Sequence, residues 1–348
     1  MDGQIAAILA QDGLTSGAVY ALLALALVLV FSVTRVIFIP QGEFVAFGAM
    51  TLAAIQNGAA PQLTWLLIAM GLLVLVLDVG AALRATGNGA ARPSLWRSAA
   101  RHLLFPVVLH LLVRRLPLAG LPAPLQAMLA MLIVIPLGPM LYRLVYRRLA
   151  EADTLVLLIV SVAVHFVLTG LGLLMFGAEG ARAKPFSEAT LDLGLIEVGG
   201  QAVTVIAVSA LLIAALYLYF GLSLSGKALR ATAVNRRGAR LVGIGSEGAG
   251  KRAFGLAAAM GALSGVLIAP ITTVFYDSGF LIGLKGFVGA IIGGLVSYPA
   301  AAAGAVLVGL LEAYSSFWAS SFKEVIVFTL ILPVLLWRSL RGRHGGDH

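Results

Sequence analysis

A glycine-rich string in the C-terminal half has the spacing of a phosphate-binding loop. The string Gly245-Ser-Glu-Gly-Ala-Gly250-Lys251 matches up to its last position, where Arg252 stands in place of the Ser or Thr that binds magnesium. Residues 243–248 also match a dinucleotide-binding spacing. Such loops need a strand before them and a helix after them, and here no strand is expected before the apolar helix that follows. We therefore expect no nucleotide, and no other cofactor, on this chain.

The same segment is rich in bases. Residues 226–252 contain seven Lys and Arg against Glu247 alone. On a helical wheel four of them fall within an arc of about 120°, which predicts a short amphipathic helix over residues 227–242, ended by Gly243 and Gly245 as glycine caps. These four are Arg230, Arg236, Arg237 and Arg240. The helix suits two uses, resting on anionic lipid headgroups or docking to a cytoplasmic partner.

A broken apolar element over residues 38–49 is the second candidate site. Pro40 and Gly42 interrupt it and Glu43 follows. A carboxylate at mid-bilayer costs about 2.5–3.5 kcal/mol, so Glu43 is expected either at the membrane interface or facing a polar interior. The order of crossings puts it near the cytoplasmic side.

Residues 283–290 show a similar pattern, with a charge just before Phe-Val and small residues around it. Transporters often contain two related halves whose broken helices meet in mid-membrane. We therefore expect five residues near a translocation path: Gln41, Gly42, Glu43, Lys285 and Phe287.

The remaining chemistry-bearing residues favour neither catalysis nor metal binding. The five histidines, at positions 102, 110, 165, 344 and 348, lack ligand spacing, and no Ser/His/Asp set or carboxylate pair falls in an apolar run. We predict no catalytic residue and no metal site. The small residues Gly289, Gly293 and Gly294 are expected to let helices pack closely.

The composition indicates that the segments carrying these residues lie in a lipid bilayer. Only 11% of the 348 residues are charged and 60% are hydrophobic, whereas globular domains have roughly 25% and 45–50%. We predict an all-α, polytopic integral membrane helix bundle of eight to ten transmembrane segments, forming a single domain over residues 1–348. This excludes a separate soluble enzyme domain.

Charge sets the expected orientation of the spans. The basic segment 226–252 and Arg143, Arg147 and Arg148 belong in the cytoplasm, and residues 177–201, with four acids and two bases, belong outside. The N-terminus is then outside and the C-terminus cytoplasmic. Residues 102–116 fit either a poor span or an interfacial helix, since a pair of crossings there puts Arg114 and Arg115 outside, against the positive-inside rule.

Five stretches, in order along the chain, resemble the permeases of branched-chain amino acid ABC transporters. They are residues 13–31, 38–49, 142–149, 226–244 and 283–299. Residues 84–122 have no recognised counterpart and are expected to be an insertion.

The resemblance implies an all-helical subunit of an importer in a prokaryotic inner membrane, working by alternating access. Its implied partners are a second permease, homologous or identical, two cytoplasmic ATPase subunits that bind ATP and magnesium, and a periplasmic or extracellular substrate-binding protein. The implied substrates are branched-chain amino acids or related small amino-acid and amide solutes. The chain itself is then not an enzyme.

The resemblance also gives the basic segment a role, as the coupling segment that fits a groove of the ATPase. The implied coupling residues are Arg230, Arg236, Arg237, Gly238, Ala239, Arg240 and Gly243. Two positions depart from the family's pattern: Arg237 stands where the general loop of the superfamily has an acid, and Gln41 where this family usually has His. The second departure implies a changed path lining, and with it a changed substrate.

An ion-coupled secondary transporter of a small polar solute is the alternative. Such a protein needs ionisable residues within its spans, and apart from Asp78 and His165 few are evident in the predicted spans.

Overall fold

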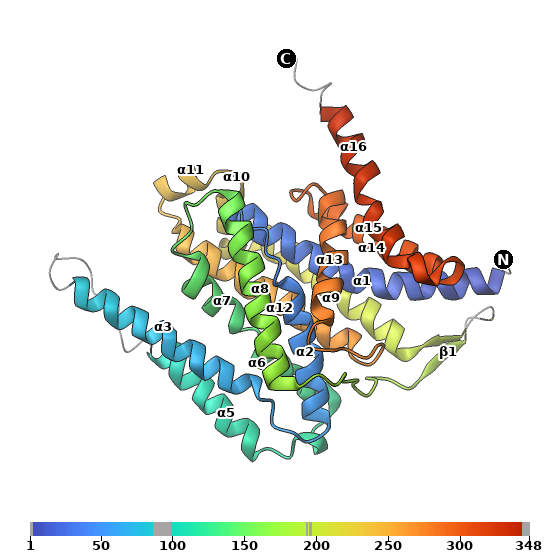
Figure 1. The fold of residues 1–348 in the computed structure, drawn as a ribbon, viewed down its shortest axis with the longest axis horizontal. Helices are drawn as coiled ribbons and strands as arrows, with labels where there is room; N and C mark the ends of the chain where they lie inside the picture. Colours follow the sequence, from blue (N-terminus) through green and yellow to red (C-terminus); the bar gives the residue numbers. More distant parts are fainter. Residues whose placement is uncertain (1–2, 86–98, 193, 195–196, 343–348) are drawn as a thin grey trace.

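The computed structural model describes residues 3–85, 99–192, 194 and 197–342, and it is a bundle of helices with one small hairpin (Figure 1). The longer helices are α1 (Gly3–Thr34), α3 (Leu63–Ala85), α8 (Thr154–Phe176), α9 (Gly200–Leu222), α12 (Ser246–Ile268) and α14 (Tyr298–Trp318). The shorter helices are α2 (Gln41–Gln56), α5 (Phe105–Arg115), α6 (Ala123–Val134), α7 (Leu137–Leu141), α10 (Leu224–Val234), α11 (Arg236–Leu241), α13 (Ser278–Ile292), α15 (Lys323–Thr329) and α16 (Ile331–Gly342). Single turns η1 (Ala100–Leu104), η2 (Leu118–Gly120), η3 (Tyr142–Tyr146) and η4 (Ser320–Phe322) join them, and β1 (Thr190–Asp192) pairs antiparallel with β2 (Glu197–Gly199).

The all-α, multi-pass class is confirmed. Within the described residues, seven helices are long and apolar enough to cross a membrane, one of them the continuous Ala123–Tyr146 element made of α6, α7 and η3. The sequence predicts eight to ten crossings; the seven do not include the C-terminal residues 323–342, which form the short helices α15 and α16, nor α2 and α13. With 16 and 15 residues α2 and α13 are shorter than the roughly 20 residues that a crossing needs.

Two opposite ends of the bundle can be defined. The basic end comprises residues 143–153, α10, α11 and the start of α12; the hairpin end comprises residues 177–199, including β1 and β2. Helix α8 runs from the basic end to the hairpin end, and α9 runs back to the basic end. The backbone bond from Ala183 to Ala269 brings the segment after α12 to the hairpin end.

Helices α2 and α13 each span about half of the distance between the basic end and the hairpin end, and they run in opposite directions. The side chain of Gln56, the last residue of α2, accepts a 2.6 Å hydrogen bond from the backbone N–H of Lys184, so α2 finishes at the hairpin end. Past α13, the carbonyl of Leu295 accepts from Ser32 in the last turns of α1, which contacts α10 at the basic end. The first turns of α2 and α13 meet in the middle, where Gly42 lies against Gly279 and Gly283.

Helices α3 and α5 lie side by side at the edge of the molecule (Figure 1). The chain reverses between them, because His110 of α5 meets Thr64 in the first turn of α3 at 2.8 Å. Residues 102–116, for which the sequence left a poor span or an interfacial helix open, form η1 and α5, which run antiparallel along α3. Arg114 lies over the ring of Trp65. Residues 86–98 of the predicted insertion lie outside the described residues, and the insertion itself stays a prediction.

Helix α1 is the centre of the packing. Its residues from Val19 to Val30 are at most 6% exposed, and it contacts α9, α12, α13 and α14. The α1–α14 contact is backbone against backbone, since a Cβ on Gly309 would stand 2.4 Å from the carbonyl oxygen of Gly13 and from the amide nitrogen of Gly17. Small residues give this closeness, as expected for helices that pack in lipid.

Gly309→Ala should therefore destabilise the bundle by about 1–3 kcal/mol, because the added methyl must separate two central helices. The measurement is the apparent melting temperature of the purified chain in detergent. Gly170→Ala is the matched control: Gly170 lies on α8, and nothing stands within 4 Å of its added Cβ. Equal melting temperatures for the two variants would contradict the packing described for α1 and α14.

Candidate functional site

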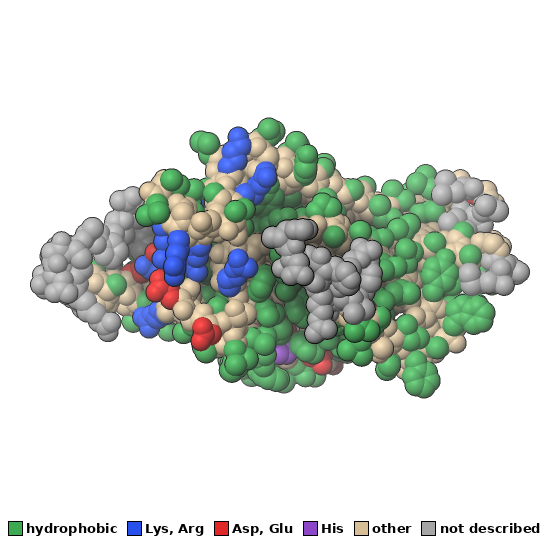
Figure 2. All heavy atoms as spheres, turned by 90° about the horizontal axis from the view of Figure 1, so that it is seen from above, with side chains coloured by type: hydrophobic (Ala, Val, Ile, Leu, Met, Phe, Trp, Pro, Cys, Tyr) green, Lys and Arg blue, Asp and Glu red, His purple; other side chains and the backbone are tan. Residues whose placement is uncertain are grey.

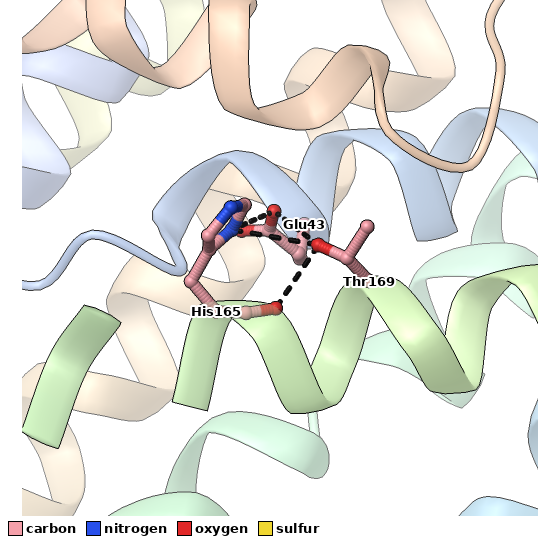
Figure 3. A network of polar contacts seen from close by, with 3 residues as sticks. All are labelled: Glu43, His165 and Thr169. Carbon is pink, nitrogen blue, oxygen red and sulfur yellow. Dashed lines mark hydrogen bonds and ion pairs between the residues drawn. The ribbon is translucent and has the colours of Figure 1, made fainter. Parts of the chain in front are cut away.

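The first turns of the half-helices α2 and α13 meet at Gly42 and Gly279, and this joint is a polar site in the interior of the bundle. Glu43, in the first turn of α2, is fully buried, and its Oε1 lies 2.7 Å from Nδ1 of His165 (Figure 3). Thr169, one turn further along α8, donates to the carbonyl of His165 and lies 3.5 Å from the same Glu43 oxygen. The Phe280 ring, from the first turn of α13, packs on the His165 ring with centroids 4.8 Å apart.

The position of Glu43 along the bundle differs from the expectation, which placed it near the cytoplasmic side. His165 stands at the midpoint of α8, so its partner Glu43 lies about midway along the bundle rather than near one end. The reason is the path of residues 35–40: the chain leaves α1 at Arg35, where φ is +63°, and turns back into the bundle before α2 begins. Of the two expected environments, Glu43 has the polar interior one.

Gln41 begins α2 and donates from Nε2 to the carbonyl of Ala257 on α12 at 2.9 Å. Its Oε1 is buried and has no hydrogen-bond partner among the described residues, and neither has Oε2 of Glu43. Gln41 lines a cavity of about 20 Å³ with Phe38, Phe280, Gly283 and Phe287. The joint thus combines unpaired acceptors with apolar walls, and it brings together four of the five predicted path residues: Gln41, Gly42, Glu43 and Phe287.

Gly42 is where the two half-helices touch. A Cβ at this position would overlap the carbonyl group of Gly279 and stand 3.3 Å from the Cα of Gly283. The carboxyl group of the neighbouring Glu43 sits at the start of α2, where a helix dipole favours negative charge. The sequence signal for the joint was the Pro40–Glu43 interruption.

Lys285 lies in a separate ion cluster. Its Nζ is 2.5 Å from Oε1 of Glu312 on α14 and 3.0 Å from Oε1 of Glu324 on α15. Tyr20 of α1 donates to the second Glu312 oxygen at 2.7 Å. Sequence reasoning did not single out Glu312 or Glu324, although an acid such as Glu312 within an apolar run is itself a signal of a polar interior.

The basic segment is folded differently from the predicted single helix. It forms two helices, α10 and α11, because Asn235 between them is extended and its side chain caps α11 by accepting from the backbone N–H of Gly238. Gly243 has φ +84° and ends the segment, as the predicted glycine cap requires. Ala239 is buried against the body, whereas Leu241 and Val242 are 89% and 75% exposed.

The four arginines of this segment have different surroundings. Arg236 donates to the carbonyl of Ala150 at 2.9 Å, and Arg240 lies 3.1 Å from Ser246 and 3.4 Å from Glu151. Arg230 instead lines a mostly apolar cavity of about 470 Å³, together with Tyr217 and Tyr298. Arg237 is exposed and makes no ion pair with the described residues. Lysines and arginines gather on this part of the surface (Figure 2).

The predicted packing glycines have two uses. Cβ atoms on Gly289 and Gly293 would fall within 2.7 Å of atoms of Ala305 and Ala301, so these two glycines fit α13 against α14. Gly294 lies beyond α13 with φ +69°, where it serves the turn rather than a helix contact. The described residues hold no group of three His, Asp or Glu that could bind a metal ion.

Comparison with known proteins gives consistent matches. A family model described as "Branched-chain amino acid transport system / permease component" matches residues 99–335. The branched-chain amino acid transport system permease protein LivH of Salmonella typhimurium is 25% identical over 336 residues, covering 93% of this chain and 91% of that protein. LivH of Escherichia coli K12 is 29% identical, covering 60% of this chain and 70% of that protein, and BraD of Pseudomonas aeruginosa is 28% identical, covering 58% and 68%. No solved structure gives a significant match.

A double-mutant cycle tests the Glu43–His165 pair. Glu43→Gln and His165→Asn each remove one half of a buried pair, and the double variant should lose less free energy of unfolding than the sum of the two, by about 0.5–3 kcal/mol. Thermal unfolding in detergent measures all four proteins. Additive losses would show that the two side chains do not interact.

Proposed function

The chain belongs to the family of branched-chain amino acid transport system permease components, a family of helical multi-pass membrane proteins, and on this premise we propose that it is a membrane subunit of an ATP-driven importer. The family match is the observation that supports this proposal most strongly. The proposed partners are a second permease, two cytoplasmic ATPases that bind ATP and magnesium, and a substrate-binding protein on the other side of the membrane. The relatives reported above are permeases of branched-chain transport systems, and they give no support to an ion-coupled carrier.

The orientation follows from the charge. The basic end is proposed to face the cytoplasm and the hairpin end the outside, with the N-terminus outside and the C-terminus inside a prokaryotic inner membrane. Four acids and two bases in residues 177–201 agree with an outer location for the hairpin end.

The surface of α10 and α11 supports docking of an ATPase. Val234, Leu241 and Val242 are between 75% and 89% exposed at the basic end, and no described part of the chain covers them. Exposed apolar side chains that lie together on a polar surface mark interaction sites. Arg237, exposed among them, adds a charge that suits an acidic groove on the partner.

A path for coupling runs from this surface to the joint. Arg236 and Arg240 tie α11 to residues 150–151 and to the start of α12. Helix α12 in turn packs on α2, since Gly265 lies against the carbonyl of Val45 and Gln41 bonds to Ala257. A push on α11 is thereby transmitted to the α2–α13 joint through direct contacts.

The joint itself is the proposed position of the solute on its path. Two helix N-termini meet there and favour a carboxylate, and the unpaired oxygens of Gln41 and Glu43 accept N–H donors such as an ammonium group. Apolar walls from Phe38, Phe280 and Phe287 suit an aliphatic side chain. The proposed substrates are therefore branched-chain amino acids or related amino-acid and amide solutes.

Copurification tests the proposed assembly. The tagged chain, extracted from its native host in mild detergent, should bring down a second permease and two ATPases, identified by mass spectrometry. Arg237→Glu and Leu241→Asp should each reduce ATPase recovery about tenfold or more, because they alter the proposed docking surface without removing a described contact.

Two variants with the same chemical changes elsewhere serve as controls. Arg115→Glu lies at the end of α5, and Leu191→Asp lies in the hairpin, where Leu191 is 52% exposed. Both should copurify like the wild type. A chain that purifies alone, or a loss shared by the control variants, would refute docking at α10 and α11.

Gln41→Ala tests the proposed path. It should lower uptake about tenfold or change the ranking of solutes at equal membrane expression, because the joint loses its amide. Gln126→Ala is the matched control: Gln126 is also buried and also donates from Nε2 to one carbonyl, that of Leu118, but it lies on α6. Equal effects on uptake would mean that Gln41 matters only for packing.

A further inference from the structure

A cavity at the basic end, separate from the joint, is the strongest remaining feature. It has a volume of about 310 Å³ and lies between α11, residues 147–151 and the start of α12. Its walls include Tyr142, Arg147, Arg148, Arg236, Arg240 and Ser246. This volume falls in the range of small-molecule sites, which begins at about 300 Å³.

The charges of the cavity are unbalanced. Four arginines line it, against Glu151 and Glu247. Glu247 is paired with Arg147 at 2.8 Å and Glu151 with Arg240 at 3.4 Å. Arg148 and Arg236 are then left without a carboxylate partner among the described residues.

The contacts of these two arginines leave donors available. Arg148 makes no hydrogen bond or ion pair with a described residue. Arg236 uses one N–H on the Ala150 carbonyl, and its Nε is buried without a described partner. Guanidinium groups prefer planar, bidentate contacts to carboxylate or phosphate.

Two further groups point into the same space. Tyr142 is only 3% exposed, and its hydroxyl has no hydrogen-bond partner among the described residues. It fits over α12 because Gly250 leaves room for its ring. Ser246 is the first residue of the 23-residue helix α12, whose N-terminal N–H groups and dipole favour an anion.

We propose that this cavity binds a phosphate group, supplied by a soluble organic phosphate or by a lipid headgroup. Several guanidinium groups, a tyrosine hydroxyl and a helix N-terminus suit a dianion better than a single carboxylate. The site is not the phosphate-binding loop whose spacing residues 245–251 match, because no strand precedes α12 in residues 200–245. Bound phosphate would bridge α11, residues 147–151 and α12. Because only this chain is involved, the site does not depend on the proposed transport function.

Binding of inorganic pyrophosphate to the full-length chain tests the proposal. Titration calorimetry is done at fixed ionic strength on the chain in nanodiscs of neutral phosphatidylcholine. The wild type should bind, and Arg148→Gln and Arg236→Gln should each raise Kd about tenfold or more. Arg148→Gln removes no described contact, so loss of folding cannot explain its effect.

Arg237→Gln is the matched control, since it removes the same charge from the same helix but outside the cavity. Its Kd should stay within about twofold of the wild-type value. Absence of binding in the wild type would overturn the proposal, and an equal loss in Arg237→Gln would overturn it in favour of diffuse attraction to a basic surface.

A second experiment distinguishes a lipid headgroup from a soluble phosphate as the ligand. Native mass spectrometry of chain extracted from membranes containing phosphatidylglycerol should show retained lipid in the wild type and in Arg237→Gln, but not in Arg148→Gln, if the headgroup is the ligand. Pyrophosphate binding with no such lipid difference assigns the site to a soluble phosphate. Lipid retained equally by all three proteins, without pyrophosphate binding, would refute the site.

Discussion

Lipid offers no hydrogen-bond partner to a peptide group, and this constraint governs the architecture of the bundle. A helix that begins in mid-membrane leaves about four backbone N–H groups without an intrahelical partner, so its first turn must be surrounded by protein. Helices α2 and α13 both begin there: α2 packs against α1, α6, α8 and α12, and α13 packs against α1, α2 and α14. Their enclosure requires the close backbone contact that Gly42 and Gly279 allow. Helix α1 takes part in this enclosure, because it packs against both α13 and α2.

The buried charges are arranged around this break in two separate groups. At the joint, Glu43 has His165 as its partner, so an acid at the start of α2 is both favoured by the helix dipole and paired. Lys285, further along α13, has Glu312 and Glu324 instead. Each half-helix therefore has its own charged residue with its own partner on a neighbouring helix, and the charged side chains help fix how α2 and α13 sit in the bundle.

Local patterns in the sequence predicted a large part of this arrangement. Proline and glycine next to Glu43 marked the start of α2, and the run of bases marked α10 and α11, because both signals are short-range. The partners of the charges could not be predicted, since Glu43 and His165 are 122 residues apart in sequence and no periodicity links them. The single helix predicted over residues 227–242 was wrong at Asn235, where the side chain competes with the helix for backbone hydrogen bonds.

The small size of the cavity at the joint has a consequence for the energetics of the cell. A volume of about 20 Å³ holds about one water molecule. Proton conduction across a bilayer needs a continuous file of hydrogen-bonded water, and a single molecule walled in by phenylalanine rings cannot provide it. The joint as it stands thus leaves no room for such a file of water, although two helices stop halfway across the bundle.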